Sequence, residues 1–429
     1  MIRFYLSSLA IASLFSIAGV FHSQAQTAPD KVIVLHAAHL LDVEHGSLIT
    51  PGEVLVRGNK IVEAGASVSH PGGAEVIDLG GATLMPGLID AHVHLFLHPG
   101  AEDLQTVQES VPERTILAEL AARDDLMAGY TAERDMGTEG AGSADTAVRN
   151  AINKGLIPGP RMRISGNAIS ILGGHEDAID YNPASHVPSN ADYANNAAEL
   201  VETIRRQLKE GADFIKIYET GKDHLRDGKF TTPYQYTEEE LAVAVKETAR
   251  VGTRVGVHCT GEPGALYAAK AGVASIDHAD YLSDETMRIM KEKQIFAVPT
   301  FTIVEYFGQH ADPSVGDWDD ASQKFHAAEF KKQMAAGVPF AVGSDVGPFP
   351  HGTQAREMEL MVQFGMTPAD VLKADLINGA KLLDWAGQIG ELKPGYFADV
   401  IAVQGNPLEN ISATKSVSFV MKNGVVYKR

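Results

Sequence analysis

Eight apolar segments of strand length alternate with helical segments through the middle of this chain. Helix signals stand between them, such as Thr115 to Ala128 ended by Gly129, and the capping box of Thr237 and Glu240. This alternation predicts the α/β class and a (β/α)8 TIM barrel, whose chemistry lies at the C-terminal strand ends. The expected strands are Leu88–His94, Tyr130–Met136, Met162–Ile169, Phe214–Tyr218, Arg254–His258, Ala274–His278, Phe296–Thr300 and Pro339–Asp345.

Short β-rich segments stand at both ends of the chain. Val54 to Ala64 is two alternating runs joined at Gly58-Asn59, which predicts a hairpin. The segments 398–403, 417–420 and 425–427 repeat this pattern near the C-terminus. We therefore expect the ends to pair into a small β-sandwich domain, residues 26–83 and 392–429, beside a barrel at residues 84–391.

The first 25 residues have the pattern of a signal peptide. Arg3 precedes an apolar run from Leu9 to Val20, and Ser23-Gln24-Ala25 has the form of a cleavage site. The run is shorter than the roughly 20 residues that span a bilayer, which favours cleavage over a retained anchor. We expect export to the periplasm or the medium, with no stable membrane insertion after cleavage.

Charge and cysteine content narrow the class of protein. The net charge of −19 argues against nucleic acid or an anionic membrane surface as a partner, because phosphate binding needs clustered Lys and Arg. The single cysteine, Cys259, permits no intrachain disulfide. It follows His258 on an expected strand, so we expect it to pack away from any site. These features favour an enzyme acting on a small molecule.

Residues of metal-ligand type stand in or at the ends of the expected strands. His92 and His94 share one face of a strand, because alternate side chains point the same way. Each residue has a structural alternative: a solvated His-x-His, a paired buried lysine, a core histidine or a turn cap. The joint pattern at the C-terminal strand ends favours a metal site instead. The candidate ligands are His92, His94, Lys216, His258, His278 and Asp345.

These motifs together resemble the amidohydrolase superfamily of metal-dependent hydrolases, over nearly the whole mature chain. The matching segments are Met85 to His94, Lys216-Ile217-Tyr218, His258, Ile276 to Ala279, Gly343-Ser344-Asp345 and Leu392 to Val400.

The resemblance implies a binuclear zinc site, bridged by Lys216 after carbamylation with carbon dioxide. His92, His94 and Asp345 would hold one ion, and His258 and His278 the other. A hydroxide bridging the two ions would attack the scissile carbonyl, since metal binding lowers the pKa of water to about 7. Asp345 would take its proton and pass it to the leaving amine.

Within the superfamily, the chain is most similar to a group that includes imidazolonepropionase, Xaa-Pro and Xaa-Arg dipeptidases, and ochratoxin-hydrolysing amidohydrolases. The features are Thr131 to Gly137, Gly173-Gly174-His175, Lys216-Ile217-Tyr218 and His351-Gly352. Ala132-Glu133 departs from the more usual Thr-Val pair, which puts the packing of the neighbouring loop in doubt.

Three residues are candidate substrate contacts. His175 and Tyr218 would donate hydrogen bonds to the oxyanion or to the substrate's carboxylate, and so count with Lys216 and Asp345 as candidate catalytic residues. The alternatives are core filling for Tyr218 and a plain surface turn for His175. His351 is a weaker candidate. Arg134 and Asp135 are interpreted as a structural ion pair.

Three long loops are expected to carry specificity: residues 175–196, 219–236 and 302–323. Aromatic and histidine side chains predict a mouth that suits a bulky acyl group or an aromatic amino acid, although contacts within an oligomer explain such loops equally well. These residues are Tyr181, His186, His224, Tyr234, Phe301, Tyr306, Phe307, His310 and Trp318.

The leading prediction is a zinc amidohydrolase that removes the C-terminal amino acid from dipeptides or N-acyl amino acids, plausibly including ochratoxin A. The alternatives are a cyclic amidase or deaminase of the same superfamily, and an exported binding protein without catalysis. Deaminases of the family place a glutamate three residues after the strand-five histidine, whereas Glu262 lies one residue further along. The resemblance also implies a homo-oligomer.

Overall fold

The computed structural model describes residues 31–100, 102–177, 181–182, 184–221, 224–226, 229–310 and 320–429. The predicted signal peptide lies outside these residues, as does Trp318. In the part of the chain that is described, no helix is both long enough and apolar enough to cross a bilayer.

Parallel strands form the centre of the molecule, in two groups. One group has the order β10-β9-β8, and the other has the order β12-β11-β13-β16-β17-β18. Their bounds are β8 Leu88–Val93, β9 Tyr130–Asp135, β10 Arg161–Ile164, β11 Ile169–Ser170, β12 Asp192–Tyr193, β13 Ile215–Tyr218, β16 Val255–Cys259, β17 Ser275–His278 and β18 Phe296–Val298. The third expected strand is interrupted, because Gly166 takes a left-handed conformation with φ of 73°.

Backbone hydrogen bonds connect the two groups on both sides. On one side the Asp213 amide donates to the Ile164 carbonyl at 2.8 Å. On the other side lies the eighth expected strand, which forms only isolated bridges to β18 and to Val93. The Ala91 amide donates to Val342 at 2.9 Å and the Asp345 amide to His92 at 2.8 Å. Pairing stays short because Asp345 is left-handed, with φ of 62°.

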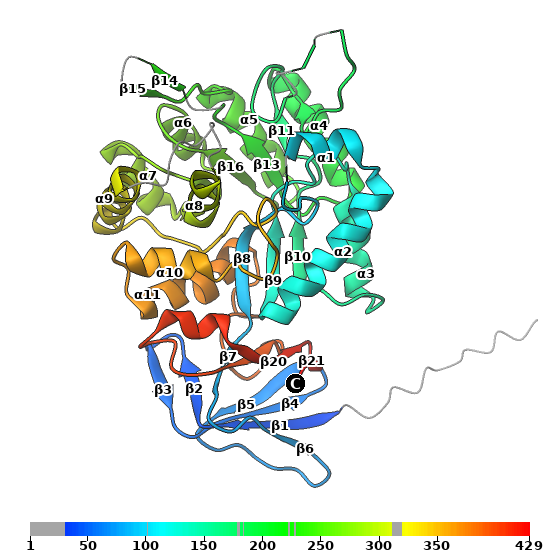
Figure 1. Ribbon diagram of the computed structural model, residues 1–429, viewed down its shortest axis with the longest axis vertical. Helices are drawn as coiled ribbons and strands as arrows, with labels where there is room; N and C mark the ends of the chain where they lie inside the picture. Colours follow the sequence, from blue (N-terminus) through cyan, green and yellow to red (C-terminus); the bar gives the residue numbers. More distant parts are fainter. Residues whose placement is uncertain are drawn as a thin grey trace, which may run out of the picture.

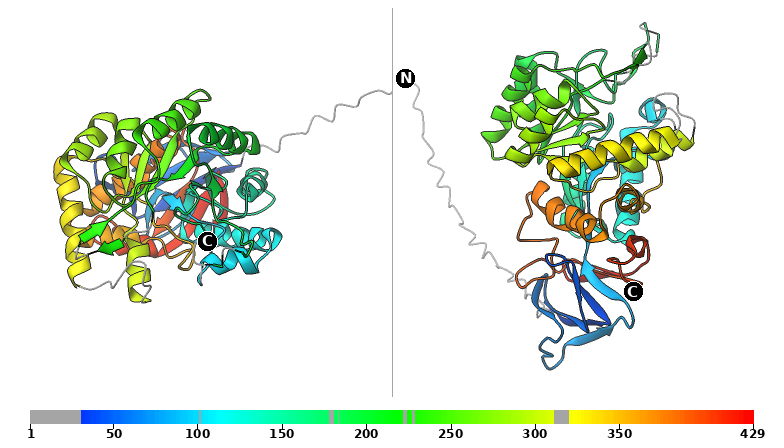
Figure 2. Two further views of the ribbon diagram at one scale, coloured as in Figure 1. Left: turned by 90° about the horizontal axis from the view of Figure 1, so that it is seen from above. Right: turned by 90° about the vertical axis from the view of Figure 1, so that its left-hand side faces the viewer.

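Helices surround these strands, as the view from above in Figure 2 shows. Their ends follow the capping signals: Gly129 is left-handed after α2, and Thr237 and Glu240 form the expected capping box of α5. Helix α2 begins earlier than expected. Ser110 caps it, and Pro112 stands in its first turn, where a helix tolerates proline. The helices are α1 Glu102–Gln108, α2 Val111–Ala128, α3 Ala144–Asn153, α4 Ala197–Glu210, α5 Glu238–Ala249, α6 Gly264–Ala271, α7 Asp284–Lys293, α8 Phe301–Gln309, α9 Asp320–Ala336, α10 Arg356–Gln363, α11 Pro368–Lys373, the π-helix η1 Ala374–Asn378, α12 Gly379–Leu382 and the 3-10 helix η2 Ile411–Lys415.

Strands from both chain ends lie together at one end of the molecule (Figure 1). They form two sheets, with the orders β5-β4-β1-β6 and β21-β20-β19-β7-β2-β3, and the latter pairs β7 with β19 antiparallel. The expected hairpin at Gly58-Asn59 joins β4 to β5. The bounds are β1 Val32–Ala37, β2 His39–Asp42, β3 Ser47–Ile49, β4 Gly52–Arg57, β5 Lys60–Gly65, β6 Glu75–Asp78, β7 Thr83–Pro86, β19 Val400–Val403, β20 Val417–Lys422 and β21 Val425–Lys428, with a separate hairpin of β14 His224–Arg226 and β15 Lys229–Thr231.

The two terminal sheets share one buried apolar cluster, which includes Ile33 and Val54 from one sheet and Leu84 and Phe419 from the other. Gly87 then leads from β7 into β8. A Cβ at Gly87 would lie 2.1 Å from the Thr131 hydroxyl oxygen on β9, so only glycine fits this close approach. The terminal sheets are therefore packed directly against the start of the first central strand.

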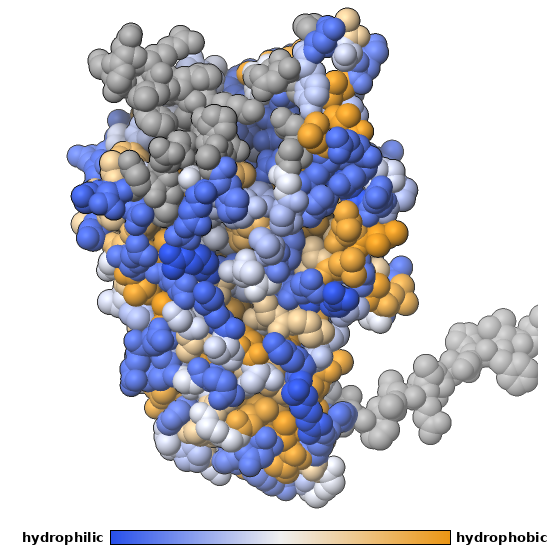
Figure 3. All heavy atoms as spheres, viewed as in Figure 1, coloured by the Kyte–Doolittle hydropathy of each residue, from blue (hydrophilic) through white to orange (hydrophobic). Residues whose placement is uncertain are grey.

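The face of the molecule in Figure 3 is mostly polar, with apolar side chains exposed in several places, α2 among them. On that helix Ile116 is 65% exposed and Leu120 is 38% exposed. The two residues are four positions apart and therefore share one helix face. This face is available for contact with another molecule.

Candidate metal centre

Three of the predicted ligands converge where β8 ends. The Nε2 atoms of His92 and His94 lie 3.3 Å apart. The Oδ1 atom of Asp345 lies 3.3 Å from His92 Nε2 and 3.2 Å from His94 Nε2. His92 lies within the irregular pairing of β8 with β9, between Asp90 and Val93, and His94 follows directly after it. Their ring nitrogens and one carboxylate oxygen thus point at a common position.

His258 and His278 complete the cluster from β16 and β17. Their ring centroids are 4.3 Å apart, and the His92 ring is 5.3 Å from that of His278. Donor atoms of His92, His278 and Asp345 all lie within 4.8 Å of one another, close enough to hold one metal ion. His258 Nε2 is buried and has no hydrogen-bond partner among the described residues. Such an orphaned nitrogen fits a metal ligand.

Lys216 lies in β13 opposite Gly256 of β16, two residues before His258, and is 1% exposed. Its ammonium forms no hydrogen bond or ion pair within the described part of the chain; the nearest ring, that of Tyr218, is 5.3 Å away. Burial lowers the pKa of Lys216, which favours the neutral amine. A neutral amine is the form that reacts with carbon dioxide, so this lysine fits the predicted carbamate.

The electrostatics of the cluster suit a divalent cation. Burial lowers the pKa of His278 to about 3 and that of His258 well below its usual range, so both rings are neutral at pH 7 and offer a lone pair. Burial raises the pKa of the Asp345 carboxyl, but His92 and His94 outweigh it and hold this pKa well below its ordinary value. Burial opposes protonation of His94, but Asp345 and Glu139 outweigh it and in turn raise the pKa of His94 well above its ordinary value. An anionic carboxylate beside the neutral rings of His258 and His278 is a fitting set of ligands for zinc.

A buried carboxylate orients His92 from behind. His92 Nδ1 lies 3.0 Å from Asp277 Oδ2, and Arg134 Nη2 donates to the same oxygen at 2.9 Å. The predicted ion pair of Arg134 with Asp135 is therefore wrong: the guanidinium pairs with Asp277, because adjacent residues of a strand point to opposite faces. Asp277 fixes His92 with Nε2 toward the site.

Asp277→Asn is expected to lower the free energy of unfolding by about 3–5 kcal/mol, because it leaves the Arg134 guanidinium buried without a counter-charge. Urea unfolding at neutral pH measures this loss. Glu292→Gln is the control: it removes the surface pair with Arg288, whose side chains are both 58% exposed, and is expected to cost at most about 0.5 kcal/mol. Equal losses in the two variants would contradict the structural role of Asp277.

The pair also predicts a pH dependence. Burial raises the pKa of Asp277, but Arg134 and His92 lower it below the ordinary value. A carboxyl with a depressed folded-state pKa stabilises the protein above its unfolded-state pKa, about 3.9, and loses this contribution on acidification. The free energy of unfolding of the unaltered protein should therefore fall as the pH decreases, and it should fall less steeply in Asp277→Asn.

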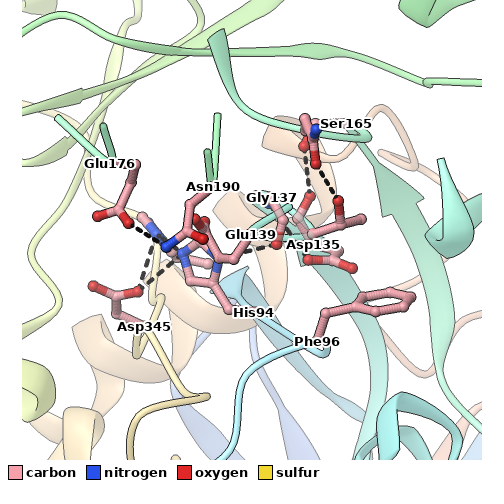
Figure 4. A network of polar contacts seen from close by, with 12 residues as sticks. His94, Phe96, Asp135, Gly137, Glu139, Ser165, Glu176, Asn190 and Asp345 are labelled. Atoms are coloured by element: carbon pink, nitrogen blue, oxygen red, sulfur yellow. Dashed lines mark hydrogen bonds and ion pairs between the residues drawn. The ribbon is translucent and has the colours of Figure 1, made fainter. Parts of the chain in front are cut away.

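Glu139, which sequence reasoning missed, binds His94 from the opposite side to Asp345 (Figure 4). Its Oε1 lies 3.1 Å from His94 Nδ1 and accepts a hydrogen bond from the Tyr218 hydroxyl at 3.0 Å. Glu139 is 2% exposed and left-handed, with φ of 46°. The only sequence signal was an acidic residue in the loop after a strand.

His175 and Tyr218 lie beside the cluster, as predicted for substrate contacts. The His175 ring is 4.1 Å from the His258 ring and 4.6 Å from the Tyr218 ring. Glu176 lies 3.3 Å from His175 Nε2 and accepts from Asn190 Nδ2 at 3.0 Å (Figure 4). The loop after β11 thus brings a histidine and an acid to the edge of the metal site.

The structure does not bring His351 to this cluster. Its Nδ1 lies 2.7 Å from Asp125 Oδ2 on α2, and the carboxylate also accepts the Gly352 amide at 2.8 Å. The buried Asp125 carboxylate holds the His351 ring, and among the described residues no contact joins His351 to the predicted metal ligands. Asp125 therefore anchors the loop that carries His351 to α2.

One other expectation, about the aromatic mouth, changes. Phe301 is core rather than mouth, since it is 4% exposed and its ring packs 5.3 Å from that of Phe330. Glu262 accepts hydrogen bonds from the Ser283 amide and the Thr286 hydroxyl, which places it at the start of α7. Cys259 is buried as expected, with Sγ donating to the Gly261 carbonyl.

Comparison with known proteins defines the class. The model of the amidohydrolase family matches residues 83–427, and the chain belongs to this family. It is a hydrolase that acts on carbon–nitrogen bonds. Its fold is that of the family's α/β structures, and the cluster described above is a possible metal site within it.

Among its relatives, the ochratoxinase of Aspergillus niger is 34% identical over 375 residues, covering 80% of this chain and 75% of the relative. The imidazolonepropionase of Streptomyces griseus is 25% identical over 372 residues, covering 82% and 86%. Among solved structures, a Xaa-Pro dipeptidase with bound methionine in the active site has a TM-score of 0.83 and 30% identity, covering 93% of this chain and all of that one.

Proposed function

We propose that this protein is a zinc-dependent amidohydrolase that cleaves the amide bond to a C-terminal amino acid in dipeptides or N-acyl amino acids. The observation that supports it most is the convergence of His92, His94 and Asp345 with His258 and His278 around the buried amine of Lys216. A protein that only binds a metal or a ligand does not need a carboxylate that moves a proton, so Asp345 among these ligands favours an enzyme over a binding protein.

In this proposal His92, His94 and Asp345 would hold one zinc ion, His258 and His278 would hold the other, and Lys216, once carbamylated, would be a ligand to both. When bound, two such ions supply a nucleophile at neutral pH and polarise the scissile carbonyl. Asp345 accepts a proton from the attacking water and delivers it to the leaving amine. His175, beside His258, donates a hydrogen bond to the carboxylate or to the developing oxyanion of the substrate. Tyr218 lies beside His175, but its one hydroxyl proton goes to Glu139, so its phenol oxygen faces the substrate as an acceptor rather than as the predicted donor.

The choice of substrate follows the relatives. One relative, at 34% identity, is named an ochratoxinase, and one solved structure, at 30% identity, is a Xaa-Pro dipeptidase with bound methionine in the active site. We therefore propose a carboxypeptidase-like reaction, with ochratoxin A, which releases phenylalanine and ochratoxin alpha, as one candidate substrate. A cyclic amidase of the imidazolonepropionase type is the second candidate, supported by the relative at 25% identity.

The proposal also includes the closed barrel, the terminal β-sandwich, export and assembly into an oligomer. The hydrogen bonds on both sides of the central strands support a closed (β/α)8 barrel at residues 84–391. The core shared by the terminal sheets supports a β-sandwich at residues 26–83 and 392–429. We also propose export after signal cleavage and a homo-oligomer, whose mass sedimentation would measure.

A hydrolysis screen tests the function. Zinc-loaded mature protein is incubated with Xaa-Pro, Xaa-Phe and Xaa-Arg dipeptides, N-acyl amino acids, ochratoxin A and imidazolone propionate, and products are identified by mass spectrometry. We expect release of a C-terminal amino acid that stops with a chelator and resumes when zinc is restored. Ring opening alone would move the assignment to the cyclic amidases, and no product from any compound would contradict an amide hydrolase.

A further inference from the structure

Glu139 connects two parts of the site that come from strands not adjacent in the sheet. His94 follows β8, whereas Tyr218 lies in β13, and both side chains reach the same oxygen, Glu139 Oε1, at 3.1 and 3.0 Å. Neither partner is close to Glu139 in sequence. We propose that Glu139 is a positioning residue that couples metal binding through His94 to substrate binding through Tyr218, an inference that rests on the proposed function.

The contact with His94 selects which ring nitrogen is left for a metal. Nδ1 lies 3.1 Å from Glu139 Oε1 and also 3.1 Å from the Gly137 carbonyl oxygen. Both are acceptors, so Nδ1 carries a proton, and Nε2 is the ring nitrogen that faces Asp345 and is left for a metal ion. A carboxylate behind a ligating histidine fixes its orientation in this way and raises its basicity.

The contact with Tyr218 fixes the phenol beside the site. Tyr218 is 4% exposed, and its hydroxyl donates only to Glu139 among the described residues. Its ring lies 4.6 Å from that of His175 and 5.4 Å from that of His258. Without this hydrogen bond the hydroxyl would be left buried and unpaired, and the side chain would lose its defined orientation.

The loop that carries Glu139 is held firmly enough for this role. The Glu139 carbonyl accepts from Arg114 Nη1 at 2.5 Å and from the Thr106 hydroxyl at 3.0 Å. Arg114 is 1% exposed and also donates to the Phe96 carbonyl at 2.8 Å, which ties the loop to the segment just after His94. The Asn167 side-chain oxygen accepts from the Thr138 hydroxyl and the amides of Gly140 and Gly142. Main-chain anchors on both sides therefore set the position of the Glu139 carboxylate.

Metal affinity, measured without substrate, tests the His94 half. Zinc alone is titrated against a chelating dye for the unaltered protein, Glu139→Ala and Glu139→Gln. We expect Glu139→Ala to bind zinc about 10–100-fold more weakly, and Glu139→Gln to restore most of the affinity because its amide oxygen accepts both hydrogen bonds. Glu109→Ala is the control, since it removes another carboxylate paired with a histidine, His98, at 2.8 Å. Unchanged zinc affinity in folded Glu139→Ala would overturn the proposal.

A double-mutant cycle tests the Tyr218 half. Tyr218→Phe, Glu139→Ala and the double variant are compared in KM for the amide substrate found by the screen. We expect each single variant to raise KM and the double variant to add little, because both remove one interaction. Additive effects on KM would overturn the coupling.

The two proposals fail in distinguishable ways. If no compound in the screen is hydrolysed, the zinc titration still decides the role of Glu139 at His94. In that case the same variants of Tyr218 and Glu139 are compared by the midpoint of urea unfolding of the apoprotein. If the two side chains share a hydrogen bond, the shift of the midpoint in the double variant is not the sum of the two single shifts. Additive midpoints there would overturn the Tyr218 half whatever the activity of the protein.

Discussion

Lys216→Met lowers turnover by a factor of about 10³ or more and removes most of the bound zinc, if Lys216 bridges two ions. Methionine has nearly the length of lysine and no charge, so it fills the same buried space in β13 without a group that reacts with carbon dioxide. Because the Lys216 ammonium has no hydrogen-bond partner among the described residues, the apoprotein should lose no stability. Steady-state kinetics, zinc content per chain and thermal unfolding of the apoprotein are the measurements.

Lys209→Met is the matched control for this change, since Lys209 lies exposed on α4. It is expected to leave zinc content and turnover unchanged. Full activity and zinc content in Lys216→Met would remove the bridging lysine from the mechanism. A lower unfolding midpoint of the apoprotein would instead indicate that the lysine has a structural partner.

Asp345→Asn lowers kcat by a factor of about 10²–10⁴, because the amide cannot accept and pass on a proton. The backbone at Asp345 is left-handed, with φ of 62°, a conformation that asparagine adopts readily and alanine does not. The variant therefore keeps its fold and retains an oxygen near His92 and His94. Single-turnover kinetics with zinc analysis separates the lost proton transfer from lost metal.

Asp384→Asn makes the same substitution at another left-handed position, with φ of 58°, where the carboxylate pairs with Arg254. It should leave kcat unchanged. If Asp345→Asn also retained the kcat of the unaltered protein with both metals bound, another residue would have to move the proton.

Much of the candidate site was predictable because strand geometry determines where side chains point. The alternation of side chains along the expected strand Leu88–His94 predicted that His92 and His94 act together, and their Nε2 atoms lie 3.3 Å apart. Apolar runs ending in His258 and His278 were enough to place both rings at the same edge of the strands, 4.3 Å apart.

The residues behind the ligands were not predictable in the same way. Asp277 and Arg134 lie on different strands, so their pairing depends on register between β9 and β17 rather than on any local pattern. Glu139 sits in a loop whose shape depends on hydrogen bonds from Arg114, on a helix 25 residues away. The eighth strand was expected from its apolar run, but the left-handed Asp345 limits its pairing.

The antiparallel pairing of β7 with β19 has a consequence for synthesis of the protein. The Thr83 hydroxyl donates to the Gly405 carbonyl, 322 residues further along the chain. At about 5–20 residues per second, a nascent chain waits roughly 15–60 s between making one strand and the other. During that interval β7 can pair with β2 but not with β19, so one edge of this sheet stays open. The segment that carries β19 closes that edge, and a premature stop before β19 leaves it exposed.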